Sequence, residues 1–528
     1  MPKSSMVALA IVILIAFGLI WYRVSSLTPP WSDEPRHFLT AKSLAVLGQP
    51  VLWDFSKGYP LEIRYTRGMV INYPLAFLYK HGFVHLAWAR TIPLFFVLLT
   101  IGFWIVYFRY KIALNATGVA LAAIFLLGQP MVLEQATFVR IYAPLGLAFS
   151  IVLACLWELR FSWIMKQRMS SIGFAALCLL GVWIPIVDSW HVAHLLLLLP
   201  ALVMLNSYVW KFCVRSIRKP VMLLLVFALL LRLGPVVIVA LAKWIPRLAW
   251  GVGIHIDAGA SYDTYWDNIF GLIRFFLAVN VMLIGLRWIH NDPDKRCVSR
   301  WLYFGGLASG VLLGLFAPPH YIFYSRYFYL SVIATTAGFA GMCVQENLKP
   351  RTQIFLIAGY LIASIAINYV NFNFDRSNSR MAMDWLKRNM ESRDVLLSYS
   401  NFHDLYGVEE LTGPNTYMLK DENVDRVIKF VSAPGVGHVY FLMENNYKFK
   451  NLLSEGITGL RHWSAMNRLV EYLHSDVYGR PVLNGLWGCD LEMFEPHQVV
   501  IALKNFKKRS HLPPTPLWQM NPFQKNIL

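Results

Sequence analysis

Long runs of apolar residues, separated by short polar segments, dominate the first 370 positions of the chain. A helix of about 20 mostly apolar residues is long enough to cross a lipid bilayer. The pattern predicts about eleven spans, and their odd number places the two termini on opposite sides of a membrane. The predicted spans are 6–22, 91–108, 113–129, 141–159, 171–187, 192–209, 220–242, 267–286, 301–317, 328–345 and 352–370.

After residue 370 the pattern changes, and short apolar runs alternate with polar ones. The runs 395–399 and 438–442 predict buried strands, whereas 379–389 and 424–430 predict amphipathic helices. We therefore expect a polytopic α-helical membrane domain over residues 1–370 and an α/β domain over 371–528. The Pro-rich end of the second domain is expected to be flexible.

Composition agrees with this division. The chain is 57% hydrophobic and 15% charged, with a mean hydropathy of +0.47, which excludes an ordinary soluble enzyme and a disordered chain. Of the net charge of +18, the first 370 residues carry +17, with 30 basic and 13 acidic side chains, against 18 and 17 in the remainder. Because these basic residues lie between apolar segments and not on one face, they do not indicate nucleic-acid binding.

The basic residues also predict the topology. They occupy alternate short connections, which the positive-inside rule places in the cytoplasm. The N-terminus is then cytoplasmic, and the first long loop, about 23–90, faces outward together with the tail; this loop is expected to carry helices along the membrane surface. The residues concerned are Lys3, Arg109, Lys111, Arg160, Lys166, Arg168, Lys211, Arg215, Arg218, Lys219, Arg287, Lys295, Arg296, Arg300, Lys349 and Arg351.

Two adjacent carboxylates, Asp33 and Glu34, follow the first span directly. Carboxylates next to hydrocarbon are costly to retain, so they are candidates for catalysis. Ser32 or Asp33 also suits the N-cap of a helix ending near Gly48, and capping is compatible with catalysis because a cap fixes the position of a carboxylate. Such a helix would turn an apolar side toward the bilayer surface, made of Phe38, Ala41, Leu44 and Ala45.

Outward-facing arginines form the second group of candidates. Arg67, Arg140 and Arg326 are suited to binding a phosphate through paired hydrogen bonds, although any single one could instead anchor the chain to lipid head groups. A Glu134–Arg140 ion pair and interfacial packing of the His191–His194 pair are the structural alternatives at two of these edges. The expected substrate cavity is lined by Glu134, Tyr142, His191 and Tyr324.

The His191–His194 spacing could bind a metal, but interfacial packing is the more common reason for such a pair. No Walker loop or Gly-rich nucleotide-binding turn accompanies these residues, so we expect no metal and no cofactor. An enzyme acting on this face would need a donor that the membrane itself delivers.

In this layout the sequence resembles the C-type membrane glycosyltransferases (GT-C), and most closely the branch of protein O-mannosyltransferases and lipid A aminoarabinose transferases. Each motif is weak alone, whereas their order along the chain is fairly specific. The motifs are Asp33-Glu34, Thr40–Gly48, Tyr65–Gly68, Ala89–Pro93, Arg140–Tyr142 and Ser325–Tyr327.

The resemblance implies inverting transfer of a sugar from a polyprenyl-phosphate carrier to a hydroxyl of a lipid A, glycolipid, O-antigen or protein acceptor. Asp33 would be the base and Glu34 would orient the acceptor, while Arg67, Arg140 and Arg326 would hold the donor phosphate. The chain departs from the aminoarabinose transferases at Asn72-Tyr73-Pro74, where they carry a Lys-Pro-Pro-like element, so the sugar is left open.

The resemblance further implies a bacterial inner-membrane protein with a periplasmic tail. A ligase or polymerase of lipid-linked oligosaccharides is the alternative enzyme. A lipid or sugar transporter is the alternative from another class, but paired broken helices, which mark many transporters, are not evident in the sequence.

Overall fold

The computed structural model of the chain describes two compact units. The helical unit comprises residues 1–26 and 66–368, and the second unit comprises residues 27–65 and 369–528. The structure describes residues 3–27, 34–54, 59–62, 68–83, 85–112, 114–164, 272–273, 275–291, 298–316, 328–345, 348–374, 385–386, 388–398, 416–418, 424–444, 480–483 and 489–509.

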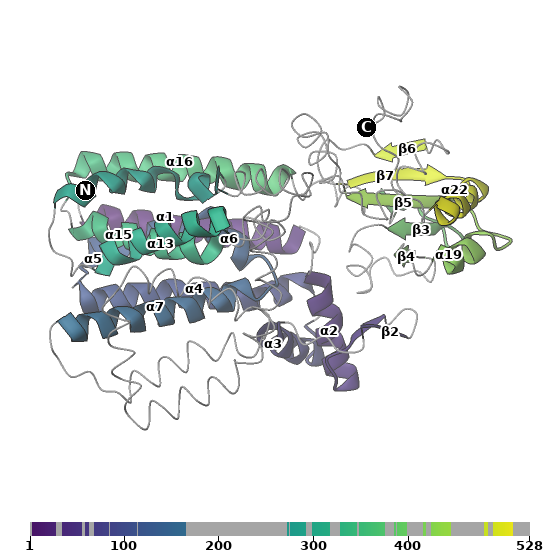
Figure 1. The fold of residues 1–528 in the computed structure, drawn as a ribbon, viewed down its shortest axis with the longest axis horizontal. Helices are drawn as coiled ribbons and strands as arrows, with labels where there is room; N and C mark the ends of the chain where they lie inside the picture. Colours follow the sequence, from purple (N-terminus) through teal and green to yellow (C-terminus); the bar gives the residue numbers. More distant parts are fainter. Residues whose placement is uncertain are drawn as a thin grey trace. The chain divides into compact units, whose positions relative to one another are not determined.

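The helical unit is built from apolar helices that run alongside one another (Figure 1). Most of the predicted spans that fall on described residues coincide with a helix, whereas 171–187, 192–209 and 220–242 lie outside these residues. The elements are α1 (Lys3–Leu27), α3 (Met69–Lys80), α4 (Leu86–Lys111), α5 (Ala116–Leu127), α6 (Pro130–Ala136), α7 (Tyr142–Ile164), the 3-10 helix η1 (Asn280–Asn291), α13 (Val298–Phe316), α15 (Tyr329–Gln345) and α16 (Pro350–Phe374).

Three helices in the described part of the chain are long and apolar enough to cross a membrane: α1, α4 and α16. Their large apolar side chains are in part exposed, as at Val106 and Ile362, which suits a surface that contacts lipid. Together with the shorter apolar helices packed beside them, they make the chain a membrane-embedded protein.

The predicted span 113–129 corresponds to α5, and the chain bends where this span ends. The helix ends at Leu127, and after Gly128 and Gln129 the chain enters α6, which is bent by 69° relative to α5. Pro130 opens α6 because a proline has no N–H to continue the ladder of α5 and is well tolerated at the first helical position. The expected short turn at 130–140 is therefore largely a helix.

Glycines let α13 and α15 approach each other closely. A Cβ atom at Gly338 would overlap the backbone of Ser299 and Tyr303, and one at Gly306 would overlap the backbone of Ser331 and Thr335. Small residues at such contacts allow helices in a membrane to gain van der Waals packing where the hydrophobic effect gives little. This contact makes α13 and α15 the tightest helix pair in the described part of the bundle.

The second unit contains a helix, a hairpin and a mixed sheet. Helix α2 (Glu34–Leu47) packs against β1 (Leu52–Asp54), which pairs antiparallel with β2 (Tyr59–Glu62). A five-stranded sheet has the order β4-β3-β5-β7-β6, in which β4, β3 and β5 are parallel and the remaining pairs antiparallel. Its elements are β3 (Val395–Ser398), β4 (Thr416–Met418), β5 (Val439–Glu444), β6 (Arg480–Leu483) and β7 (Cys489–Phe494), with helices α19 (Val424–Val431) and α22 (Pro496–Arg509).

The predicted strands at 395–399 and 438–442 are thus present as β3 and β5, and the predicted helix at 424–430 is present as α19. The hairpin of β1 and β2 was not predicted, because strands of three and four residues give too short an alternation to be recognised.

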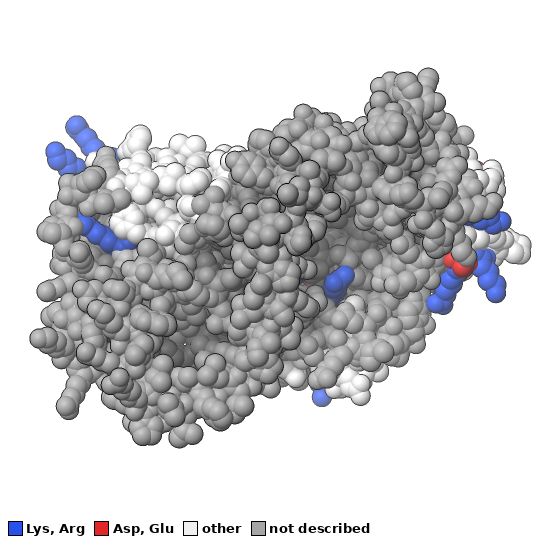
Figure 2. Space-filling model, in the orientation of Figure 1, with Lys and Arg blue, Asp and Glu red and all other residues white. Residues whose placement is uncertain are grey.

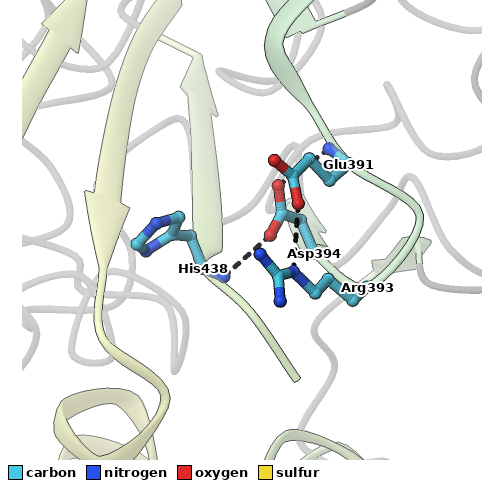
Figure 3. Close-up of polar contacts among 4 residues, drawn as sticks. All are labelled: Glu391, Arg393, Asp394 and His438. Atoms are coloured by element: carbon cyan, nitrogen blue, oxygen red, sulfur yellow. Dashed lines mark hydrogen bonds and ion pairs between the residues drawn. The ribbon is translucent and has the colours of Figure 1, made fainter. Parts of the chain in front are cut away.

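The buried carboxylate of Asp394 joins the starts of the parallel strands β3 and β5 (Figure 3). Its Oδ2 accepts a hydrogen bond from the Glu391 backbone N–H and its Oδ1 accepts one from the His438 N–H, both at 2.8 Å. A Cβ at Gly437 would overlap the same carboxylate, so glycine is needed there. Burial, with the nearby Asp394 and Glu391 carboxylates, raises the pKa of the Tyr440 phenol.

We predict that Asp394→Ala destabilises the sheet, because it removes two hydrogen bonds to a charged group, each contributing about 1.5–3 kcal/mol. The exposed Arg393–Glu391 ion pair at 3.0 Å provides a matched control. Glu391→Gln weakens that pair but keeps the backbone N–H, and exposed pairs contribute roughly 0–1 kcal/mol. Thermal unfolding of the purified chain compares the two variants, and equal losses would contradict the role given to Asp394.

Candidate functional site

The C-terminal turn of α1 is held in place by two long-range contacts. Arg90 in the second turn of α4 is fully buried, and its Nη1 donates hydrogen bonds to the carbonyls of Val24 at 3.1 Å and Ser25 at 3.3 Å. The Trp21 Nε1–H donates to the Ala136 carbonyl of α6 at 2.8 Å. The helix that leads in sequence to Asp33 is therefore fixed against α4 and α6.

The connection from α6 to α7 carries three of the predicted residues. Glu134 lies in the last turn of α6, Arg140 in the connection, and Tyr142 at the start of α7. Thr137 ends α6, because its hydroxyl donates to the carbonyls of Leu133 at 3.2 Å and Glu134 at 3.0 Å. The structure thus brings a carboxylate, a guanidinium and a phenol onto one short connection next to the end of α1.

The guanidinium of Arg140 lies near two aromatic rings. Its Cζ lies 5.9 Å from the ring centroid of Phe138 and 6.0 Å from that of Tyr142. A cation near the faces of aromatic rings is attracted to them. These contacts hold the Arg140 side chain beside the start of α7.

In the second unit, Glu34 opens α2 and is fully buried. A carboxylate in the first turn of a helix is stabilised by the positive end of the helix dipole. His37, one turn further along, is also buried, at 2% exposure, and was not predicted as a site residue. The signal that could have indicated it is the three-residue spacing, which puts it beside Glu34 on the helix.

The predicted apolar side of α2 was only partly right. Ala41 is buried, whereas Phe38, Leu44 and Ala45 are half-buried, and polar residues take the more enclosed positions. Those polar residues are Glu34, His37, Thr40 and Ser43. A helix that encloses its polar side chains in this way is positioned by the protein and not by lipid alone.

Five predicted site residues lie outside the described residues: Asp33, Arg67, His191, Tyr324 and Arg326. Two of them adjoin described elements in sequence. Asp33 precedes α2 directly, and Arg67 precedes Gly68, whose φ of 69° makes the sharp turn into α3. Their roles stay predictions.

Asn72, which departs from the Lys-Pro-Pro-like element, is fully buried in α3, and its Nδ2 lies 3.8 Å from the Met69 Sδ. A buried neutral amide here cannot supply the positive charge that a lysine would. The described residues contain no group of three or more His, Cys, Asp or Glu side chains that could hold a metal ion.

A charged cluster ties the far ends of α4 and α7 together. Lys111 Nζ lies 2.5 Å from Glu158 Oε2, and the Tyr107 hydroxyl donates to Glu158 Oε1 at 2.9 Å. On the face shown in Figure 2, Lys and Arg side chains gather at the end of the helical unit where the N-terminus is drawn, beside an uncharged surface. This distribution agrees with the basic connections that the sequence assigns to one side of the membrane.

We predict that Lys111→Met destabilises the chain by about 1–3 kcal/mol, between the values for exposed and buried pairs, because the Glu158 carboxylate loses its charged partner. Adding Glu158→Gln to that variant should restore most of the loss. Unfolding temperatures of the single and double variants in one detergent measure the coupling. Additive effects would show that the two side chains do not depend on each other.

The fold is that of a polytopic membrane protein in which α4 and α6 contact the C-terminal part of α1. Searches against protein-family models and curated proteins find no match to this sequence.

Solved structures do match. ArnT from Cupriavidus metallidurans bound to undecaprenyl phosphate is similar over 92% of this chain and 97% of its own, at 12% identity and a TM-score of 0.51. Its apo state matches over 93% and 98%, at 13% identity and a TM-score of 0.50. The oligosaccharyltransferase AglB from Archaeoglobus fulgidus, in complex with an inhibitory peptide and a dolichol-phosphate, shows 11% identity over 89% of this chain and 72% of its own, with a TM-score of 0.46. The expected ArnT-like GT-C fold is confirmed.

Proposed function

We propose that the chain is an inverting glycosyltransferase that takes a sugar from a polyprenyl-phosphate carrier and transfers it to a hydroxyl acceptor. The observation that carries this proposal is the likeness in fold, over nearly the full length of both chains, to ArnT bound to undecaprenyl phosphate. Fold alone does not determine function, so the proposal also needs residues suited to the reaction.

In the proposed reaction, Asp33 accepts the proton of the acceptor hydroxyl as its oxygen attacks the anomeric carbon of the donor. The bond from that carbon to the phosphate oxygen breaks, and the electron pair leaves with the phosphate on the carrier. Attack from the face opposite the leaving group inverts the anomeric carbon. A phosphate leaves without being protonated, so one base and a cationic clamp are sufficient.

Arg67, Arg140 and Arg326 are the proposed clamp, and the contacts of Arg140 with the Phe138 and Tyr142 rings, which hold its side chain in place, support its part in it. Glu34 is proposed to orient the acceptor, which its burial at the start of α2 supports. His191 and Tyr324 are retained as proposed cavity residues on sequence alone. The enzyme is proposed to work on the outer face of a bacterial inner membrane, with the N-terminus in the cytoplasm and the sheet of the second unit in the periplasm.

The test is mass spectrometry of lipids and surface glycans from cells with and without the gene. We expect one acceptor to lack one sugar in the null strain and a polyprenyl-phosphate sugar to accumulate, which would identify donor and acceptor together. The purified chain should then transfer that sugar from the monophosphate carrier. Transfer from a diphosphate-linked oligosaccharide only would favour the ligase, and unchanged glycans with all acceptors present would contradict transfer altogether.

A further inference from the structure

The side-chain amide of Gln135 is fully buried and makes no hydrogen bond within the described part of the chain. It lies in the last turn of α6, between Glu134 and Ala136, and its side chain has no exposed surface. Neither its Nε2 nor its Oε1 has a hydrogen-bond partner in the part of the chain that the structure describes. Leaving a buried donor and acceptor both unpaired is unfavourable, and native proteins rarely do so without a reason.

Gln129 shows how the same side chain behaves when the fold does use it. It is equally buried, six residues earlier at the bend before α6. Its Nε2 donates to the Ala278 carbonyl at 3.2 Å and to the Thr336 hydroxyl at 3.1 Å, whereas its Oε1 has no partner among the described residues. Gln129 thus joins three parts of the bundle. Because a methionine would fill the volume of Gln135 without the cost of burying an amide, packing does not explain Gln135.

Gln135 adjoins Glu134 and lies five positions before Arg140, two of the candidate site residues. The carbonyl of the next residue, Ala136, accepts the hydrogen bond of Trp21, one turn before the α1 carbonyls that Arg90 holds. The hydroxyl of Ser25 in that same turn is also buried without a partner among the described residues. Two polar side chains are therefore buried without a partner among the described residues, Ser25 in α1 and Gln135 in α6, the helix that precedes the connection carrying Arg140.

From these observations we infer that Gln135 is a specificity residue that hydrogen-bonds a hydroxyl group on the sugar of the lipid-linked donor. This inference rests on the proposed function. An amide offers both a donor and an acceptor, and its best match is a group that does the same. A hydroxyl does so, whereas a phosphate oxygen only accepts and a prenyl chain does neither. Gln135 therefore recognises the sugar of the donor through a hydrogen bond, while the arginines bind its phosphate.

The experiment compares binding of two probes to the purified full-length chain in lipid nanodiscs: undecaprenyl phosphate without a sugar, and the undecaprenyl-phosphate sugar identified in the null strain. Gln135→Met should bind the bare carrier as the wild type does. It should bind the sugar-bearing carrier roughly 5- to 100-fold more weakly, the loss expected when one or two hydrogen bonds to a substrate hydroxyl are removed. Its unfolding temperature should equal or exceed that of the wild type.

Gln129→Met is the matched control. Because its amide is tied into the bundle, this variant should unfold at a lower temperature, with an unchanged ratio of affinities for the two probes. If Gln135→Met does not fold, Gln135→Asn, which keeps an amide but shortens its reach, should show the same selective loss for the sugar-bearing carrier.

Two results would overturn the inference, and they can be distinguished. An unchanged ratio of affinities in the Gln135 variants, with the wild type binding both probes, would show that the sugar does not contact Gln135 and would leave the proposed function standing. A wild-type chain that binds neither probe would refute the proposed function and the inference with it.

Discussion

Asp33→Asn should lower the rate of sugar transfer by roughly 10²–10⁴-fold, the usual contribution of a general base, with normal amounts of protein in the membrane. Asparagine keeps the size and the capping ability of the side chain but cannot accept the proton of the acceptor hydroxyl. Cells carrying this variant should therefore lack the same sugar as the null strain.

The binding probes separate this effect from a loss of structure. Asp33→Asn should bind the donor lipid as well as the wild type, because the base acts on the acceptor and the phosphate clamp is untouched. Glu34→Gln should lower the rate by a smaller factor, since Glu34 is proposed to orient and not to take the proton. Asp425→Asn, at an exposed acid in α19, serves as the control. Full activity of Asp33→Asn would remove the proposed base and leave the fold assignment intact.

Arg90→Leu should destabilise the chain and abolish most of its activity, although Arg90 is not proposed to touch substrate. The substitution removes two hydrogen bonds from a charged donor to α1, at about 1.5–3 kcal/mol each. It also frees the turn of α1 from which the chain continues to Asp33. Arg90→Lys should recover part of the stability, because an ammonium can reach one carbonyl but lacks the fork of the guanidinium.

Arg109→Gln, an exposed arginine at the other end of the same helix, is the control for removing a positive charge from α4. Unfolding temperature and transfer rate should be measured on the same preparations. If Arg90→Leu had the same unfolding temperature as Arg109→Gln and still transferred sugar at the wild-type rate, the contact between α4 and α1 would not position the site.

The sequence predicted those features that depend on local pattern. The apolar runs of α1, α4 and α16 were recognised because a membrane span is encoded in consecutive residues, and β3 and β5 because buried strands are short apolar runs. The basic ends of the helices were recognised for the same reason. Among the site residues, Glu134, Arg140 and Tyr142 lie within nine positions of one another in the sequence, and the structure places Arg140 near the ring of Tyr142; their roles stay predictions.

Features that depend on distant parts of the chain were missed. Arg90 was noted only as part of a motif, because its partners lie 65 and 66 positions earlier. The predicted span ended at Gln129, where the chain bends, but α6 after it was predicted as a turn, and the contacts that hold the bend come from residues 149 and 207 positions later. Gln135 gave no signal at all, because an unpaired buried amide can be recognised only once the surrounding packing is known.

The bend between α5 and α6 also constrains how the chain is made. Helices of 12 and 7 residues are each too short to cross a bilayer, and the amide that stabilises their junction finds Thr336 only after another two hundred residues have been synthesised. An amide left alone in hydrocarbon is unfavourable, so the nascent segment should enter the membrane straight or stay beside the insertion machinery. The hydrogen bond from Gln129 that holds the bend against α15 can then form only late in biogenesis, when α15 arrives.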